Sequence, residues 1–125
     1  MLKLLLVSHS KDSLRGLSSS LSGKDDIELE MSTSGEEALT RLSSKTVDLV
    51  VADEDLGDMT ALELSKRLLR INPMINCAVV SSLSPEEFHE ASEGLGIMTQ
   101  LPRQPGMKEA EILIRTLKQI QGLLD

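Results

Sequence analysis

Side chains able to do chemistry come directly after four short apolar segments of the chain. They are Ser8, His9 and Ser10 after the first segment; Asp53, Glu54 and Asp55 after the second; Ser81 and Ser82 after the third; and Arg103 and Gln104 close to the fourth. If these segments are neighbouring parallel strands, a carboxylate, a hydroxyl and a guanidinium converge at one edge of a sheet. That edge is where ligands and chemistry usually lie in α/β proteins.

Ser8, His9 and Asp53 are the residue types of a hydrolytic triad, but their pattern argues against one. Adjacent residues of an extended chain point to opposite sides, so Ser8 and His9 cannot easily hydrogen-bond to each other. The sequence has no nucleophile-elbow pattern. Binding of a nicotinamide cofactor requires a glycine-rich turn after the first strand. No such turn follows the first apolar segment of this chain. A small catalytic α/β protein is therefore the weakest of the functional interpretations.

Five segments have the composition of β-strands. Residues 2–7, 47–52 and 77–80 are apolar in runs rather than in alternation, which is typical of parallel strands covered on both faces. Residues 27–31 alternate between apolar and polar and predict a half-exposed edge strand, and residues 97–101 predict a weaker fifth strand.

Helical patterns fill the intervals between these strands. Their predicted starts are Asp12 or Ser13 as a first cap, Ser34 with Glu37 as a capping box, Thr60, Ser84 followed by Pro85, and Met107. The third helix is expected to end near residue 71, before Pro73, and the fifth near residue 124. The order βαβαβαβαβα predicts right-handed crossovers and one doubly wound, three-layer α/β sandwich over residues 1–125.

Composition excludes several classes of function. Thirteen Lys and Arg against twenty Asp and Glu give a net charge of −7, which disfavours nucleic acids and anionic membranes. Phe88 is the one aromatic residue, so base-stacking platforms are absent. The single cysteine, Cys77, excludes an intrachain disulfide and fits a reducing cytoplasm. The apolar N-terminal stretch is too short for a signal sequence or a membrane span, so we expect a cytoplasmic protein.

Over essentially its whole length the chain resembles the receiver domains of two-component response regulators. The strongest segment is VDLVVADEDLGDMTALEL, residues 47–64, which is similar to the family's phosphoacceptor strand and following loop. The resemblance implies a five-stranded parallel sheet of flavodoxin-like order 2-1-3-4-5 with five helices. It also implies that Asp53 accepts phosphate from a histidine kinase or phosphotransfer protein. The loop is altered, since the family commonly has glycine, aspartate and glycine where this chain has Asp58, Thr60 and Ala61.

The resemblance assigns phosphoryl-sensing roles to Ser81 and Arg103. Ser81 matches the family's serine or threonine, whose hydroxyl moves towards the phosphoryl group, and Arg103 stands at the place of the family's lysine. Developing phosphoryl charge needs such preorganised donors and cations. A second register, two residues shorter, places Leu101 and Pro102 at that site and loses the cation. We expect a trans Arg103–Gln104 bond, whereas a cis Leu101–Pro102 bond would favour the shorter register.

The first strand departs most from the family. Ser8 and His9 stand where receivers have a pair of acidic residues that hold Mg²⁺. Magnesium prefers charged oxygen ligands, and neither a neutral hydroxyl nor an imidazole is a good substitute. Asp53 and Asp55 are the ligands that remain if Mg²⁺ binds. The sequence therefore predicts no cofactor, or weakly bound Mg²⁺.

We expect a single receiver-like domain without an output domain, and two signalling functions stay open for it. In the first, Asp53 takes phosphate, although with impaired efficiency, and the change alters affinity for a partner protein. In the second, the domain is a pseudo-receiver, an adaptor that binds its partner without phosphate. The resemblance implies an output partner bound by the fourth helix, fifth strand and fifth helix. Neither function is enzymatic.

Overall fold

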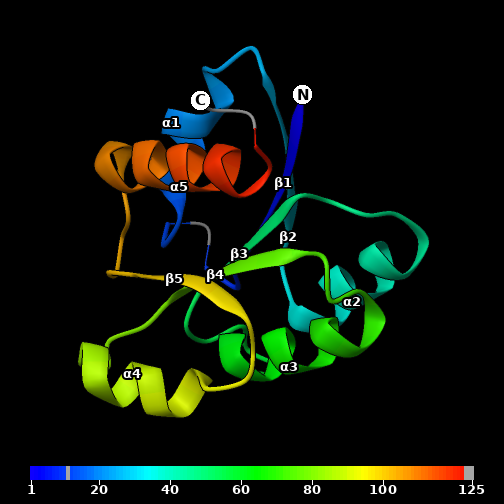
Figure 1. Ribbon diagram of the computed structural model, residues 1–125, viewed down its shortest axis with the longest axis vertical. Coiled ribbons are helices and arrows are strands. Elements are labelled where there is room, and N and C mark those ends of the chain that lie inside the picture. Colours follow the sequence, from blue (N-terminus) through cyan, green and yellow to red (C-terminus); the bar gives the residue numbers. More distant parts are fainter. Residues whose placement is uncertain (11, 123–125) are drawn as a thin grey trace.

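The computed structural model of the protein describes residues 1–10 and 12–122, in which five strands alternate with five helices (Figure 1). The strands are β1 (Leu2–Val7), β2 (Ile27–Ser32), β3 (Leu49–Ala52), β4 (Asn76–Val80) and β5 (Ile97–Leu101). The helices are α1 (Arg15–Ser22), α2 (Gly35–Ser44), α3 (Ala61–Ile71), α4 (Pro85–Ser92) and α5 (Met107–Ile120).

The strands form one parallel sheet in the order β2-β1-β3-β4-β5. This order confirms the flavodoxin-like, doubly wound fold predicted from the sequence. The register sets Ala52 beside Val7 of β1 and beside Val79 of β4. The residues that follow these three strands therefore emerge at the same edge of the sheet, where the candidate site lies.

Alternation along each buried strand divides the core between the two faces of the sheet. In β1, Leu4 and Leu6 pack with residues of α1 and α5, whereas Leu5 and Val7 pack with residues of α2 and α3. Successive side chains of a strand point to opposite faces, so a continuously apolar strand can supply both layers. Figure 1 shows α1 and α5 on one side of the sheet and α2, α3 and α4 on the other.

Short polar side chains begin three of the helices as predicted. The hydroxyls of Ser34, Thr60 and Ser84 each accept a hydrogen bond from the backbone N–H three residues later. These bonds satisfy donors that a helix leaves without intrahelical partners. Ser84 also has the reciprocal bond of a full capping box and is followed by Pro85 at the first helical position.

Several predicted boundaries were wrong. Helix α1 begins at Arg15 and its cap residue is Leu14, without a side-chain cap, because Asp12 and Ser13 lie in the preceding turn. Strand β3 begins at Leu49 rather than at residue 47. Helix α5 ends at Ile120, and the predicted end near residue 124 lies outside the described residues.

The capping box predicted for α2 is incomplete. Ser34 Oγ accepts from the Glu37 N–H at 3.1 Å, but the Glu37 carboxylate accepts from Thr33 Oγ1 instead of returning a bond to the cap.

Among residues 1–10 and 12–122, no helix has the length and apolar character needed to cross a membrane.

Candidate functional site

Asp53 follows the last residue of β3 and lies at the carboxyl edge of the sheet. Its backbone N–H donates to the carbonyl oxygen of Val7 at 2.9 Å, which continues the pairing of β3 with β1. Its carboxylate is half-buried and has two partners: Oδ1 accepts from the Glu54 N–H at 2.9 Å, and Oδ2 accepts from Ser8 Oγ at 3.0 Å. The parallel sheet thus brings together groups that are 45 residues apart in the chain.

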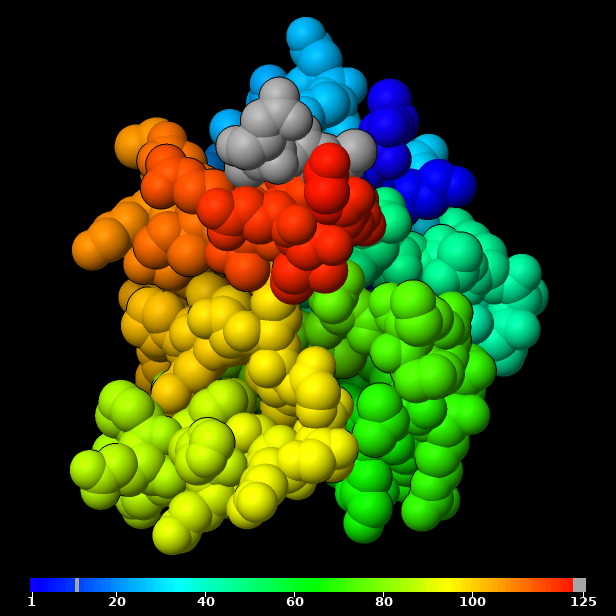
Figure 2. All heavy atoms as spheres, viewed as in Figure 1, coloured from blue at the N-terminus to red at the C-terminus, as the bar shows by residue number. Residues whose placement is uncertain are grey.

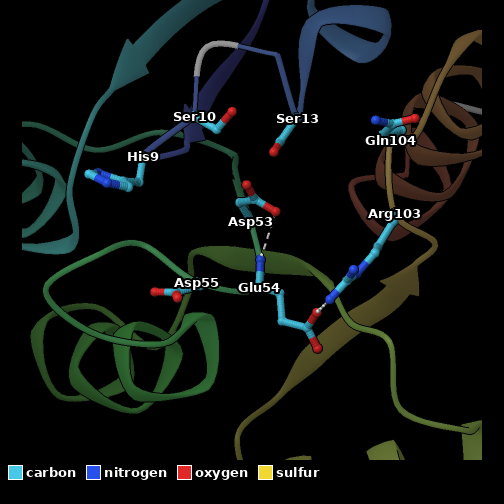
Figure 3. A pocket seen from close by; sticks show the side chains of 8 residues that line it. All are labelled: His9, Ser10, Ser13, Asp53, Glu54, Asp55, Arg103 and Gln104. Atoms are coloured by element: carbon cyan, nitrogen blue, oxygen red, sulfur yellow. Dashed lines mark hydrogen bonds and ion pairs between the residues drawn. The ribbon is translucent and has the colours of Figure 1, made fainter.

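A hollow of about 530 Å³ opens beside this carboxylate (Figure 3). It is lined by His9, Ser10, Ser13, Asp53, Glu54, Asp55, Arg103 and Gln104. The segments that follow β1, β3 and β5 therefore meet here, as predicted for parallel strands, whereas Ser81 and Ser82 after β4 do not line the hollow.

Ser8 and His9 face different surroundings. Ser8 is buried, and its hydroxyl lies 2.7 Å from the Ser10 carbonyl oxygen as well as 3.0 Å from Asp53 Oδ2, so its one proton can serve either acceptor. The exposed His9 ring turns away from Asp53 (Figure 3) and lies against Gly57. A Cβ at Gly57 would lie 3.0 Å from His9 Nδ1, and the φ of +85° there also favours glycine. Asp53, Ser8 and His9 therefore do not form a triad.

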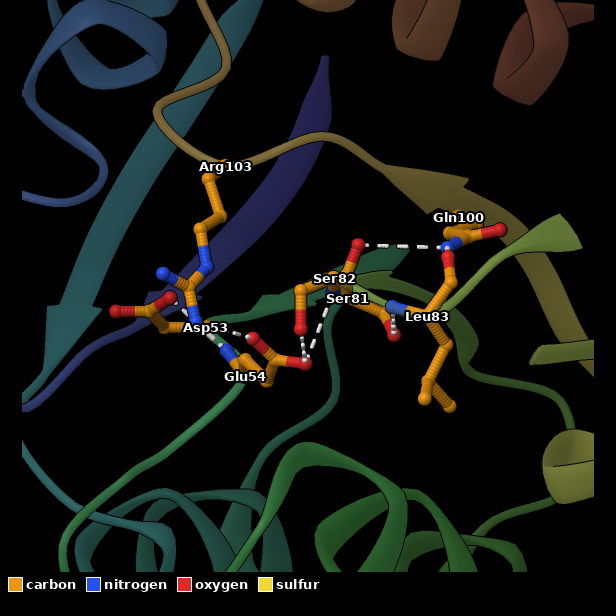
Figure 4. A network of polar contacts seen from close by, with 7 residues as sticks. All are labelled: Asp53, Glu54, Ser81, Ser82, Leu83, Gln100 and Arg103. Carbon is orange, nitrogen blue, oxygen red and sulfur yellow. Dashed lines mark hydrogen bonds and ion pairs between the residues drawn. The ribbon is translucent and has the colours of Figure 1, made fainter. Parts of the chain in front are cut away.

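Glu54 makes the most extensive side-chain contacts of the site (Figure 4). Its Oε2 accepts from both the N–H and the hydroxyl of Ser82, each at 2.9 Å, and its Oε1 lies 3.3 Å from Arg103 Nη2. The Ser82 backbone hydrogen bond is the main cause that lowers the pKa of Glu54 below its ordinary value, and the Ser82 hydroxyl and Arg103 add to it. Burial opposes the shift. Arg103 thus forms its ion pair with Glu54 and not with Asp53.

Ser81 and Gln100 organise the segment that links β4 to α4. Ser81 is buried, and its hydroxyl accepts from the Leu83 N–H at 3.2 Å rather than contacting Asp53. The Gln100 amide donates to the Leu83 carbonyl oxygen at 2.8 Å and to the Ser81 carbonyl oxygen at 3.3 Å (Figure 4). Ser81 therefore lies near the site but has no side-chain bond to it, and it does not line the hollow.

The comparisons with known proteins agree with this architecture. The family model described as the response regulator receiver domain matches residues 4–118. The chain belongs to this family. Receiver domains are generally signalling domains that act through protein partners such as kinases and output domains. A search of curated proteins finds no significant match.

Solved receiver structures share the fold of this receiver domain. A CheY-like receiver protein from Methanospirillum hungatei JF-1 has a TM-score of 0.84 at 18% identity and covers 99% of each chain. The chemotaxis response regulator CheY4 of Vibrio cholerae has a TM-score of 0.82 at 18% identity, with 94% of this chain and 98% of that chain covered. The signal receiver domain of an HD domain-containing protein from Pseudomonas fluorescens Pf-5 has a TM-score of 0.82 at 22% identity, covering 96% and 88% respectively.

The donors around Asp53 in this receiver domain do not fit the Mg²⁺ ion that the family resemblance implies. Mg²⁺ requires charged oxygen ligands in near-octahedral geometry, but Ser8 offers a neutral hydroxyl and His9 turns away. The Asp55 carboxylate accepts from the Gly57 N–H at 2.9 Å. In the described part of the chain, no three His, Cys, Asp or Glu side chains are grouped so that they could hold a metal ion.

The end of β5 favours the register in which Arg103 occupies the cation position. Leu101 is the last residue of β5, is buried, and accepts a backbone bond from the Ser81 N–H at 3.1 Å. Arg103 lines the hollow two residues later. The Arg103–Gln104 and Leu101–Pro102 bonds are both trans, the first as expected.

Two residues of this network were not identified from the sequence. The sequence places Glu54 at a strand end but does not identify it as the partner of Ser82 and Arg103, and it assigns no role to Gln100. The available signal for Glu54 is its place directly after Asp53 at the strand end, where it lines the same hollow.

Proposed function

We propose that this receiver domain regulates a partner protein in two-component signalling through surface contacts, and that Asp53 is a poor phosphoacceptor. The observation behind the proposal is the Ser8 hydroxyl, which lies 3.0 Å from Asp53 Oδ2 at a position where a cation-binding receiver needs a carboxylate. Without that charge, the site lacks the means to neutralise the incoming phosphoryl oxygens. Signalling would then depend on the folded surface more than on phosphate.

The arrangement of Arg103 supports the same proposal. A phosphoryl group on Asp53 would need a nearby cation, but Arg103 is paired with Glu54 at 3.3 Å. If Arg103 moved to a phosphoryl group on Asp53, Glu54 would lose its cation. The loss of that ion pair would offset part of the free energy with which Arg103 stabilises the phosphoryl group. The roles of Asp53 as phosphoacceptor and of Ser81 and Arg103 as phosphoryl sensors stay secondary in this proposal.

The partner surface that we propose consists of α4, β5 and α5, which lie next to one another on the face seen in Figure 2. Large apolar side chains are exposed on α5, namely Met107 (68%), Ile112 (45%) and Ile120 (54%), and Leu83 (37%) is exposed in the segment just before α4. Exposed apolar side chains in one region commonly mark a protein contact. A histidine kinase, phosphotransfer protein or output protein in the cytoplasm would be the partner.

Incubation with acetyl phosphate and Mg²⁺, followed by intact-mass analysis, tests the phosphoacceptor part of the proposal. We expect little phosphorylated protein from the wild type. The double variant Ser8→Asp/His9→Asp, which restores the acidic pair, should be phosphorylated to a higher level at the same Mg²⁺ concentration. Stoichiometric phosphorylation of the wild-type chain at Asp53 would overturn the proposal.

A second measurement tests whether signalling requires Asp53. We expect Asp53→Ala to keep its affinity for a captured partner, since the proposed surface does not include this side chain. If Asp53→Ala abolished signalling while fold and protein level were unchanged, the phosphoacceptor function would be the correct one.

A further inference from the structure

The segment of residues 81–84, which we call the β4–α4 loop, is held from two sides by side chains of other strand ends. Glu54, after β3, binds Ser82 through both the backbone N–H and the hydroxyl. Gln100, in β5, binds the carbonyl oxygens of Ser81 and Leu83. The loop therefore has a defined conformation that involves no bond to Asp53.

Glu54 is the charged member of this arrangement. Its two carboxylate oxygens have separate partners, because Oε2 accepts from Ser82 and Oε1 pairs with Arg103. Hydrogen bonds to a carboxylate are roughly twice as strong as neutral ones. The Glu54 side chain is 32% exposed and the Arg103 side chain is 73% exposed, and Ser82 is exposed as well. The carboxylate thus bridges the β4–α4 loop to the segment that follows β5.

A phosphoryl group on Asp53 would offer the same chemistry, namely anionic oxygens between a hydroxyl of the β4–α4 loop and a cation after β5. In this chain, both kinds of donor already have an anionic partner. Gln100 adds neutral bonds on the opposite side of the loop, at 2.8 and 3.3 Å. A rearrangement of the loop would have to break contacts with both Glu54 and Gln100.

We propose that Glu54 is a positioning residue that fixes the β4–α4 loop and Arg103 in one arrangement with its own carboxylate, independently of Asp53. The inference rests on the proposed function, since it explains how a poorly phosphorylated receiver presents a constant partner surface. It adds to that function the residue that sets the conformation of the loop. Asp53 has no bond to Ser81, Ser82 or Arg103 among the side-chain contacts described, in agreement with this assignment.

Amide hydrogen exchange of residues 81–84, followed by NMR, tests the inference. In Glu54→Ala, exchange at Ser82 should accelerate by about tenfold, as expected from the loss of one charge-assisted hydrogen bond. Glu54→Gln keeps an acceptor oxygen, so we expect an acceleration of about threefold at Ser82 with complete loss of the Arg103 ion pair. Glu30→Gln is the matched control. Glu30, on β2, is similarly exposed (30%) and pairs with Lys45 and Arg41.

The possible results separate this inference from the proposed function. Unchanged Ser82 exchange in folded Glu54→Ala, or an equal change in Asp53→Ala, would overturn the positioning role even if Asp53 resists phosphorylation. Efficient phosphorylation of wild-type Asp53 would overturn the proposed function but would not change the expected Glu54 effect. If Glu54→Ala does not fold, Gln100→Leu serves as the second variant. Its expected result is faster exchange at Leu83 and Ser84 with Ser82 still protected, and loss of protection at Ser82 as well would contradict independent ties.

Discussion

The substitution Ser8→Asp tests our inference that a neutral side chain at this position weakens Mg²⁺ binding. Ser8 is 7% exposed and its hydroxyl lies 3.0 Å from Asp53 Oδ2, so an aspartate there places two carboxylates almost in contact. Two unit charges 4 Å apart repel by about 1 kcal/mol in water and about 4 kcal/mol near a protein surface. Ser8→Asn introduces a side chain of the same size as aspartate but without the charge. Because 1 kcal/mol corresponds to about 4 °C for a domain of this size, the Asp variant should melt about 4–16 °C below the Asn variant.

Addition of Mg²⁺ completes the test of this substitution. If the new carboxylate creates a site with a Kd of about 1 mM, about 10 mM Mg²⁺ contributes about 1.4 kcal/mol of stability. Thermal unfolding should then shift upward by about 6 °C in Ser8→Asp. The wild type and Ser8→Asn should not respond beyond the effect of ionic strength, for which NaCl is the control. An equal shift of the wild type with Mg²⁺ would refute the reasoning that Ser8 removes cation binding.

Three further predictions concern stability and reactivity. The Asp58 carboxylate accepts hydrogen bonds from the first two N–H groups of α2 at 2.9 Å each, and these bonds lower the pKa of Asp58 below the ordinary 3.8. At neutral pH, the wild type should therefore unfold at a higher urea concentration than Asp58→Asn. This difference should shrink as the pH falls through and below 3.8, because the carboxylate becomes protonated. Burial raises the pKa of the Cys77 thiol to about 11, so alkylation by a maleimide should be slow in folded protein and fast in urea. Leu113→Ala should cost about 2–5 kcal/mol by urea unfolding, whereas exposed Ile112→Ala should change stability by less than about 0.5 kcal/mol.

The fold could be predicted because its signals are local and repeated. Continuous apolar segments identified β1, β3 and β4, and the hydroxyls of Ser34, Thr60 and Ser84 marked helix starts. The start of α1 could not be predicted in the same way. Asp12 and Ser13 are favourable cap residues, but they lie in the turn between β1 and α1. The helix begins at Arg15, and its cap residue, Leu14, is apolar. The tertiary position of the loop outweighs local preference there.

The positions of site residues could be predicted better than their partners. Strand order places Asp53 at the carboxyl edge of the sheet beside Ser8, which directly follows β1, and both positions follow from topology. The partner of Arg103 depends on which carboxylate its long side chain reaches, and Glu54 and Asp53 are adjacent in sequence. Residue types alone do not distinguish them, whereas the side-chain geometry assigns Arg103 to Glu54.

The differences from other receivers are physically consistent with one another. With Ser8 and His9 in place of the family's acidic pair, no carboxylate at the end of β1 repels Asp53, and the Asp53 carboxylate accepts hydrogen bonds from a hydroxyl and a backbone N–H. The next carboxylate, that of Glu54, pairs with Ser82 and Arg103. In the function that we propose, the first change weakens metal binding and the second supplies the loop with an anionic partner of its own. On this proposal, a chain with both changes keeps the receiver fold and one loop conformation without phosphate.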